Sequence, residues 1–158
     1  MRYERKIEAH QVNALRQAIG FRQLHLDQVQ MGIEGSSMVL AAYDDQTLVA
    51  MARLIWDGGG QALISDLICT RAYRDQGIEE DMVDQILIFL RDQLKPGYGI
   101  QVDIKAWQGQ VDLLARGGFI PSTPDKRGHS MHVCLTKDID LTDRHYRQMA
   151  YKGGPDEG

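Results

Sequence analysis

The side chains with the greatest capacity for chemistry lie in one stretch, residues 66–79. Asp66 is a candidate base or substrate-orienting group, or a residue that makes a structural hydrogen bond to a neighbouring loop. Farther along, Arg74 and Gln76 precede Gly77 and a predicted helix. A helix N-terminus offers free backbone N–H groups and the positive end of the helix dipole, which favour an anion. The stretch therefore predicts an anion-binding loop beside a strand.

Acidic side chains surround the same loop. Glu79, Glu80 and Asp81 follow one another at the start of the predicted helix, and Asp75 precedes it. Carboxylates in the first turn neutralise the helix dipole, and an aspartate before a helix can cap it. Near a phosphate the same charges repel, by about 1 kcal/mol at 4 Å in water and about 4 kcal/mol at an effective dielectric of 20. Residue types alone leave both interpretations open.

The elements around this loop predict a β-α-β unit. Residues 62–69 form an apolar, strand-like run that ends at Cys69. Residues 78–94 repeat apolar side chains at i, i+4 spacing, which is typical of an amphipathic helix, and Pro96 ends it. From Ile100 the period returns to two, which predicts a half-exposed strand. Such a unit places the N-terminus of its helix at the edge of the sheet.

The rest of the chain predicts elements of both kinds. Before the unit, we expect a weak strand over residues 2–7, helices over 9–19 and 23–33, and strands over 38–43 and 47–56. After it, we expect a short helix over 111–116, a strand that begins at Phe119 and a last strand over 131–135. Residues 153–158 are expected to be disordered.

Composition bounds the function. With 158 residues, 43% of them hydrophobic and 25% charged, the chain predicts one globular domain. A net charge of −4 makes nucleic acid an unlikely partner. The longest apolar stretch, residues 48–56, contains Arg53 and is far short of the roughly 20 residues that a membrane span needs. The first residues do not fit a secretory signal, so we expect a cytoplasmic enzyme or binding protein.

Cysteine and histidine predict no metal site. Cys69 and Cys134 lie in apolar runs, where a buried, inert thiol is usual, and neither belongs to a CxxC pair. His129 and His132 would point to opposite faces of a strand. We therefore expect neither a zinc site nor a disulfide.

Four segments, in order and at the expected spacing, resemble the GNAT acetyltransferase superfamily. The run from Asp66 to Ile78 resembles its strand, loop and helix start, with the loop pattern Arg/Gln-x-x-Gly-x-Gly/Ala. The run from Leu113 to Phe119 resembles its helix ending in Gly-Phe. Residues 48–55 and 128–131 are similar to its third strand and to the Gly-x-x-Met segment before its last strand. Together these segments span about residues 38–136.

The resemblance implies one α/β domain over residues 1–137, with a mixed, mostly antiparallel sheet of roughly six or seven strands and helices on both faces. Residues 138–158 would be a C-terminal extension. It also implies binding of acetyl-CoA, with the pyrophosphate on the loop and the pantetheine beside the strand as an added strand would lie. The cofactor-binding residues would be Ile68, Cys69, Arg74, Asp75, Gln76, Gly77, Ile78 and Glu79. Asp66 is the candidate catalytic residue, and no metal is expected.

The implied activity is acetyl transfer from acetyl-CoA to a primary amine of a small molecule or peptide, by direct attack in a ternary complex. Glu79 stands where the family has glycine or alanine, and Leu114 stands where its acid tyrosine usually lies. These departures favour the alternative, a non-catalytic binding or scaffold protein of the same fold. Residues 9–35 and 121–130 would shape the acceptor site. The apolar residues Tyr146, Met149 and Tyr151 suggest a homodimer.

Overall fold

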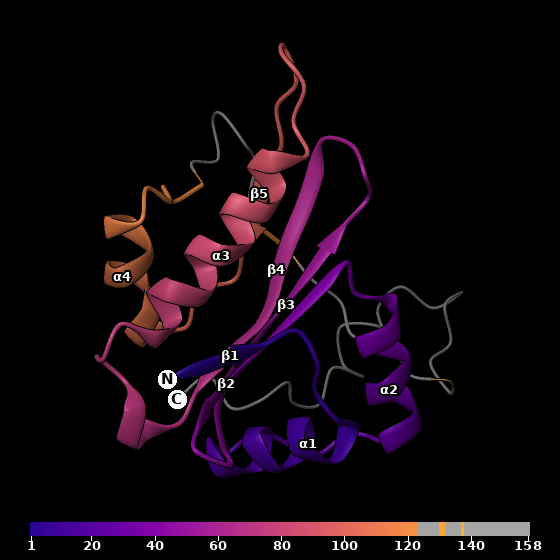
Figure 1. Cartoon of the computed structure of the whole chain (residues 1–158), viewed down its shortest axis with the longest axis vertical. Coiled ribbons are helices and arrows are strands. Elements are labelled where there is room, and N and C mark those ends of the chain that lie inside the picture. The colour runs from indigo at the N-terminus through magenta and orange to yellow at the C-terminus, as the bar shows by residue number, and fades with distance from the viewer. Residues whose placement is uncertain (123–129, 132–136, 138–158) are drawn as a thin grey trace.

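The structure is a computed structural model of the whole chain, and it describes residues 1–122, 130, 131 and 137. These residues form a five-stranded sheet in the order β1-β2-β3-β4-β5 (Figure 1). The strands are β1 (Arg2–Glu4), β2 (Met38–Asp44), β3 (Thr47–Trp56), β4 (Gln61–Cys69) and β5 (Gln101–Ile104). Neighbours from β1 to β4 are antiparallel, and β5 is parallel to β4. The predicted mixed, mostly antiparallel sheet is confirmed.

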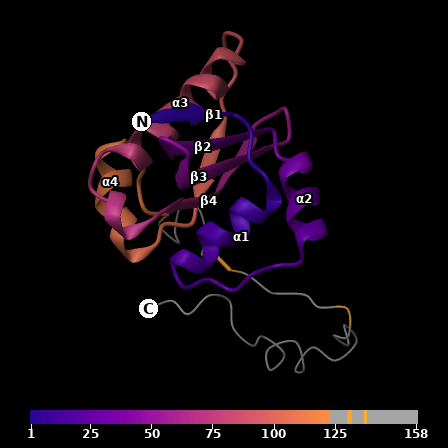
Figure 2. The same ribbon diagram turned by 60° about the horizontal axis from the view of Figure 1, so that its bottom comes forward.

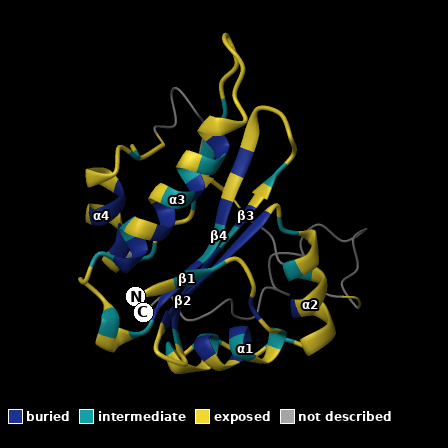
Figure 3. Ribbon diagram, viewed as in Figure 1, coloured by how far each residue is buried: buried dark blue, intermediate teal, exposed yellow. Residues whose placement is uncertain are grey.

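Helices cover both faces of this sheet, as predicted. The helices α1 (Ala9–Ala18) and α2 (Leu26–Gly35) lie on one face, and α3 (Ile78–Asp92) and α4 (Val111–Arg116) lie on the other (Figures 1 and 2). Two cores result, one between the sheet and α1 and α2, and a larger one beneath α3 and α4. Figure 3, in which the ribbon is coloured by burial, shows buried residues along the strands and within the helices.

Helix α3 follows from its apolar ladder. Ile78, Met82, Ile86 and Leu90 are all buried, while Asp81 and Asp84 on the opposite side are exposed. The helix ends at Asp92, before the predicted end at residue 94, because its last turn tightens: the N–H of Leu94 bonds the carbonyl of Arg91, three residues back, at 3.0 Å.

Near the end of the chain, one predicted strand is absent and another lies largely outside the described residues. Residues 119–122 contain no strand, although one was expected to begin at Phe119. The strand predicted over residues 131–135 falls largely outside the described residues, as do Cys134, His129, His132 and the apolar residues Tyr146, Met149 and Tyr151.

Strand β4 contains a bulge in its second half. Arg53 of β3 pairs with Ser65, but Met51 pairs with Ile68, so one extra residue of β4 is accommodated between them. Asp66 lies within this bulge, with a left-handed φ of 51°. The neighbour β5 pairs with β4 only as far as Ile64, and β4 then runs on to Cys69. The second half of β4 therefore has a free edge among the described residues.

Candidate functional site

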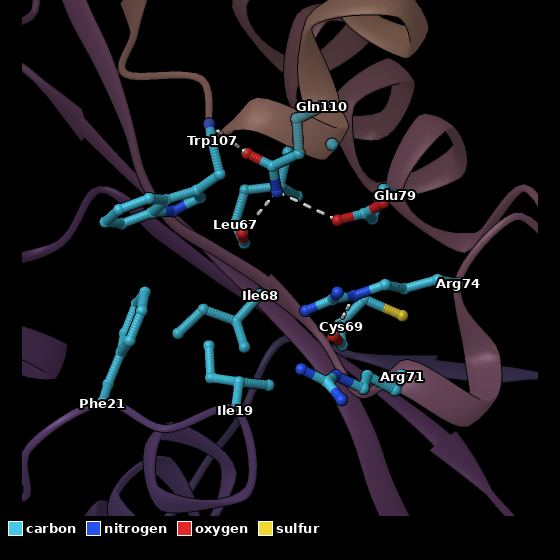
Figure 4. A pocket seen from close by; sticks show the side chains of 11 residues that line it. Ile19, Phe21, Leu67, Ile68, Cys69, Arg71, Arg74, Glu79, Trp107 and Gln110 are labelled. Carbon is cyan, nitrogen blue, oxygen red and sulfur yellow. Dashed lines mark hydrogen bonds between the residues drawn. The ribbon is translucent and has the colours of Figure 1, made fainter. Parts of the chain in front are cut away.

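A cleft of about 340 Å³ opens beside this free half of β4 (Figure 4). Its walls come from β4, from the loop between α1 and α2, from the start of α3, and from the segment after β5 that includes the short helix η2 (Gln108–Gln110). The lining residues are Ile19, Phe21, Leu67, Ile68, Cys69, Arg71, Arg74, Glu79, Trp107, Gly109 and Gln110. The cleft is therefore lined by both charged and apolar side chains.

The edge of β4 offers backbone groups to this cleft. Leu67 O accepts a hydrogen bond from Gln110 Nε2 at 2.8 Å, and Cys69 O accepts one from Arg74 Nε at 3.3 Å. The N–H of Thr70 turns the other way, to Val49 O. Because the N–H and C=O of one strand residue point to the same edge, the N–H of Cys69 also faces the cleft. An extended ligand with amide groups can therefore pair along this edge.

The start of α3 supplies backbone donors next to that edge. Its first helical hydrogen bond runs from Asp81 N–H to Gly77 O, and no side chain caps the helix. The N–H groups of the first-turn residues 78–80 consequently have no acceptor within the helix. Gly77 adopts a φ of 84°, which glycine accepts without strain, and the amide of Gln76 bonds Ala72 O at 3.0 Å. These donors lie where the sequence predicted an anion-binding loop.

The first-turn carboxylates each have a partner on another element. Glu80 lies 3.7 Å from Arg116, and Asp81 accepts a hydrogen bond from the hydroxyl of Tyr3 at 2.9 Å. Glu79 turns into the cleft, where its Oε1 accepts a hydrogen bond from Gln110 Nε2 at 2.9 Å. It is 8% exposed. Glu79 therefore does more than neutralise the dipole, since its carboxylate forms part of the cleft wall.

Burial governs the titration of two groups in the cleft. Desolvation raises the pKa of Glu79 above its ordinary value, against the hydrogen bond from Gln110, which lowers it. Desolvation also raises the pKa of Cys69 to about 11. At neutral pH the Cys69 thiol is therefore protonated and a poor nucleophile.

The loop between α1 and α2 reaches the cleft because Asn13 holds it. Its Nδ2 donates to Leu24 O at 2.7 Å and its Oδ1 accepts from the N–H of Leu24 at 3.1 Å. Asn13 is 6% exposed, so both bonds are shielded from water. Phe21, in the loop held this way, packs against Trp107 with ring centroids 4.9 Å apart.

The structure brings together part of the predicted site. Ile68, Cys69, Arg74 and Glu79 line the cleft, while Asp75, Gln76, Gly77 and Ile78 form the loop and helix start beside it without lining it. Asp66 lies elsewhere: its carboxylate is 2.8 Å from Arg53 and 3.7 Å from Arg16, and it borders a separate pocket against α1 and α2.

Sequence reasoning missed Gln110, which is 6% exposed and bridges two walls of the cleft. Nothing in the sequence marks one glutamine after a strand as a site residue. Leu114, aligned with the family's acid tyrosine, is 3% exposed in the core and does not line the cleft. No tyrosine lines the cleft among the described residues.

Solved structures described as acetyltransferases share the fold of this chain. A probable acetyltransferase from meticillin-resistant Staphylococcus aureus matches with a TM-score of 0.73 and 21% identity, over 83% of this chain and 98% of its own. A GNAT-family acetyltransferase from Streptococcus pneumoniae matches with a TM-score of 0.63 and 20% identity, over 87% of this chain and 97% of its own. The chain has the GNAT acetyltransferase fold.

A third GNAT-fold match is N-acetylglutamate synthase from Neisseria gonorrhoeae, solved with coenzyme A and L-arginine. It has a TM-score of 0.60 and 16% identity, and the match covers 79% of this chain and 28% of that one. Neither a protein-family model nor a curated protein matches the sequence. In the part of the chain that the structure describes, no helix is long and apolar enough to cross a membrane, and no cluster of side chains could hold a metal ion.

Proposed function

We propose that this protein transfers an acetyl group from acetyl-CoA to a primary amine of a small molecule or peptide. One observation carries the proposal: the free edge of β4 and the uncapped N-terminus of α3 border the same cleft, with Arg74 between them. A strand edge suits an extended chain of amides, and helix N–H groups suit a pyrophosphate. Acetyl-CoA has both features in the matching order.

The residues present fit this ligand on balance. The first-turn N–H groups lack acceptors, and Arg71 and Arg74 supply positive charge to the cleft. The Glu79 carboxylate opposes the phosphates, although its hydrogen bond to Gln110 holds it within the cleft wall. Each carbonyl oxygen on the β4 edge has a second lone pair, so the bonds from Gln110 and Arg74 leave room for a ligand amide.

Direct attack by the amine suits the chemistry of the cleft. The nitrogen lone pair forms a bond to the thioester carbonyl carbon, the carbon–sulfur bond breaks, and the thiolate leaves with a proton from solvent. The amine proton passes to solvent. Glu79, the carboxylate that lines the cleft, lies in the first turn of α3 at the phosphate end of the site, so an extended pantetheine arm would separate it from the thioester. The protonated Cys69 thiol disfavours an acyl-cysteine route.

A binding protein of the same fold is the second candidate. The observation in its favour is the Gln110 bridge, since one carboxamide joins Leu67 to Glu79 across the place where a ligand would enter. In a protein that no longer catalyses the reaction, these hydrogen bonds need not break to admit acetyl-CoA.

Calorimetry with acetyl-CoA separates the two. The transferase predicts binding that weakens with salt, because phosphates meet Arg74, and it predicts acetylation in a panel of primary amines. Arg91→Gln is a matched control, since Arg91 is exposed near the far end of α3. No heat and no thermal shift at millimolar acetyl-CoA would refute the transferase. Binding without acetylation of any amine would favour the binding protein.

A further inference from the structure

A second pocket lies between α1, α2 and the sheet. It encloses about 260 Å³, close to the lower end of the range for small-molecule sites. Most of its wall is apolar, and its charged groups are two arginines and one carboxylate. The lining residues are Val12, Arg16, Leu24, Gln28, Val29, Gly32, Ile33, Arg53 and Asp66. An apolar pocket with a few charged groups is the usual form of a specific ligand site.

Arg53 makes three hydrogen bonds in this pocket. Its Nε donates to Asp66 Oδ2 at 2.8 Å, and its Nη1 donates to Gly32 O and to Ser36 Oγ, each at 3.0 Å. Arg53 therefore joins β3, β4 and α2, and Asp66 is its ion-pair partner.

Arg16 is buried to a similar degree, but not all of its N–H groups have a hydrogen-bond acceptor in the described part of the chain. Its side chain is 12% exposed. Its Nε donates to Arg22 O at 3.1 Å, whereas its Nη1 lies 3.7 Å from Asp66, beyond hydrogen-bond distance. Among the described residues, no other side-chain or backbone acceptor bonds the outer nitrogens of Arg16. The guanidinium of Arg16 thus presents N–H donors to the pocket, and the nearest carboxylate, Asp66, is hydrogen-bonded to Arg53 instead.

The charge balance favours an added anion. Arg16 and Arg53 face a single carboxylate, Asp66, and the remaining lining residues are uncharged. Burial lowers the pKa of Arg16 despite the opposing effect of Asp66. A bound carboxylate would pair the exposed end of the guanidinium and compensate its desolvation, and arginine recognises carboxylates with two parallel hydrogen bonds.

The pocket and the cleft lie next to each other at two places. The guanidinium of Arg16 lies over the ring of Phe21, 5.4 Å from its centroid, and Phe21 lines the cleft. On the sheet side, Asp66 borders the pocket, and the next residues, Leu67 and Ile68, line the cleft. A small molecule anchored at Arg16 can therefore extend toward the cleft.

We propose that this pocket binds the carboxylate of the acceptor, so that the acceptor is a small aliphatic amino acid that presents its amine to the cleft. The apolar wall of Val12, Leu24, Val29 and Ile33 accommodates the aliphatic part. The carboxylate pairs with Arg16. The amine end of this inference rests on the proposed acetyl transfer, whereas carboxylate binding at Arg16 does not.

The test compares acceptors that differ only in the carboxylate. Glycine, β-alanine, 4-aminobutyrate and 5-aminovalerate are each assayed as acceptors against their methyl esters, and their binding is measured by calorimetry without acetyl-CoA. We expect at least one amino acid to bind, with a kcat/KM at least about tenfold above that of its ester, as a charge-assisted hydrogen bond implies. Arg16→Met, which keeps the apolar stem, should remove that preference. Arg22→Met, at an exposed arginine outside the pocket, should keep it.

The outcomes separate this inference from the proposed function. Equal acetylation of acids and esters would overturn the carboxylate pocket and leave the transferase intact. Carboxylate binding that is lost in Arg16→Met, without acetylation of any acceptor, would support the pocket and refute the transferase. An equal loss in Arg22→Met, or no binding of any amino acid, would overturn the pocket. If Arg16→Met fails to fold, the comparison of acids with esters in the wild-type protein still decides.

Discussion

Gln110 and Glu79 face each other across the cleft, joined by a hydrogen bond of 2.9 Å. The same Nε2 also donates to Leu67 O at 2.8 Å, and Gln110 Oε1 accepts from the N–H of Trp107 at 3.1 Å. One carboxamide thus links the edge of β4, the start of α3 and the segment after β5. Because these elements form three walls of the cleft, Gln110 sets both the width of the cleft and the environment of its carboxylate.

Gln110→Met tests this bridge. The change removes a buried donor from Leu67 O and from Glu79, so the free energy of unfolding should fall by about 1–3 kcal/mol. Since the lost bond lowers the pKa of Glu79, that pKa should rise, and the pH above which the Glu79 charge opposes acetyl-CoA binding should move upward. Denaturant unfolding and a pH series of the dissociation constant measure both effects. Gln93→Met, the same substitution at an exposed glutamine, should change neither. A destabilised variant with an unshifted pH dependence of binding would show that the Glu79 charge does not control acetyl-CoA affinity.

Glu79→Gln should tighten coenzyme binding and leave kcat near its wild-type value. Glu79 lies at the phosphate end of the cleft, away from the reacting carbonyl. Removing a negative charge beside the phosphate site should tighten acetyl-CoA binding several-fold, as about 1 kcal/mol of repulsion implies. Steady-state kinetics and calorimetry give the two quantities. Glu80→Gln is the control, because Glu80 turns to Arg116 and does not line the cleft. Unchanged affinity in Glu79→Gln would show that its carboxylate does not face the phosphates.

The raised pKa of Glu79 also predicts a pH dependence of stability. The folded protein holds the proton of Glu79 more tightly than the unfolded chain does, because burial raises its pKa above the ordinary 4.5. The resulting stabilisation is full below that ordinary pKa and is lost as pH rises through the folded pKa. The free energy of unfolding of the wild type, relative to Glu79→Gln, should therefore fall as pH increases across this window. Urea denaturation at several pH values measures it, and a constant difference would contradict the burial of the charge.

Local patterns predicted much of the fold. The i, i+4 ladder of α3, the antiparallel run from β2 to β4 and the short helix α4 all depend on neighbours in sequence. The glycine turn before α3 was also predictable, because Gly77 and the first turn of α3 are adjacent in the chain.

The site was less predictable because its decisive contacts are distant in sequence. Glu79 was expected either to face solvent or to repel a phosphate, but it bonds Gln110, which lies 31 residues away. Asp66 was expected to be a catalytic group or to make a structural hydrogen bond to a neighbouring loop, and in the structure, where it lies in a bulge, its carboxylate bonds Arg53 of the adjacent strand. Neither the direction of a side chain at a bulge nor its partner follows from residue spacing.

Arg74→Gln should weaken acetyl-CoA binding about tenfold, because it removes a charge-assisted bond to phosphate. It should also reduce the salt dependence of the dissociation constant, since fewer charges are then screened. Calorimetry at low and high salt measures both effects. Arg91→Gln should leave affinity and salt dependence at wild-type values. Weaker binding with unchanged salt dependence would indicate that Arg74 acts through its bond to Cys69 O and not on the ligand.

Leu114→Tyr tests whether the family's acid tyrosine can be restored at its aligned position. From the sequence, this change is expected to raise turnover or leave it unchanged. In the structure Leu114 is 3% exposed and packs in the core beneath α3, so a phenol there is too large and has no water for its hydroxyl. We therefore expect a loss of about 1–3 kcal/mol in the free energy of unfolding and no gain in kcat. Val111→Tyr, at a 48% exposed position on the same helix, should be near neutral in both measurements. A rise in kcat for Leu114→Tyr alone would mean that α4 shifts when acetyl-CoA binds and brings this position to the cleft.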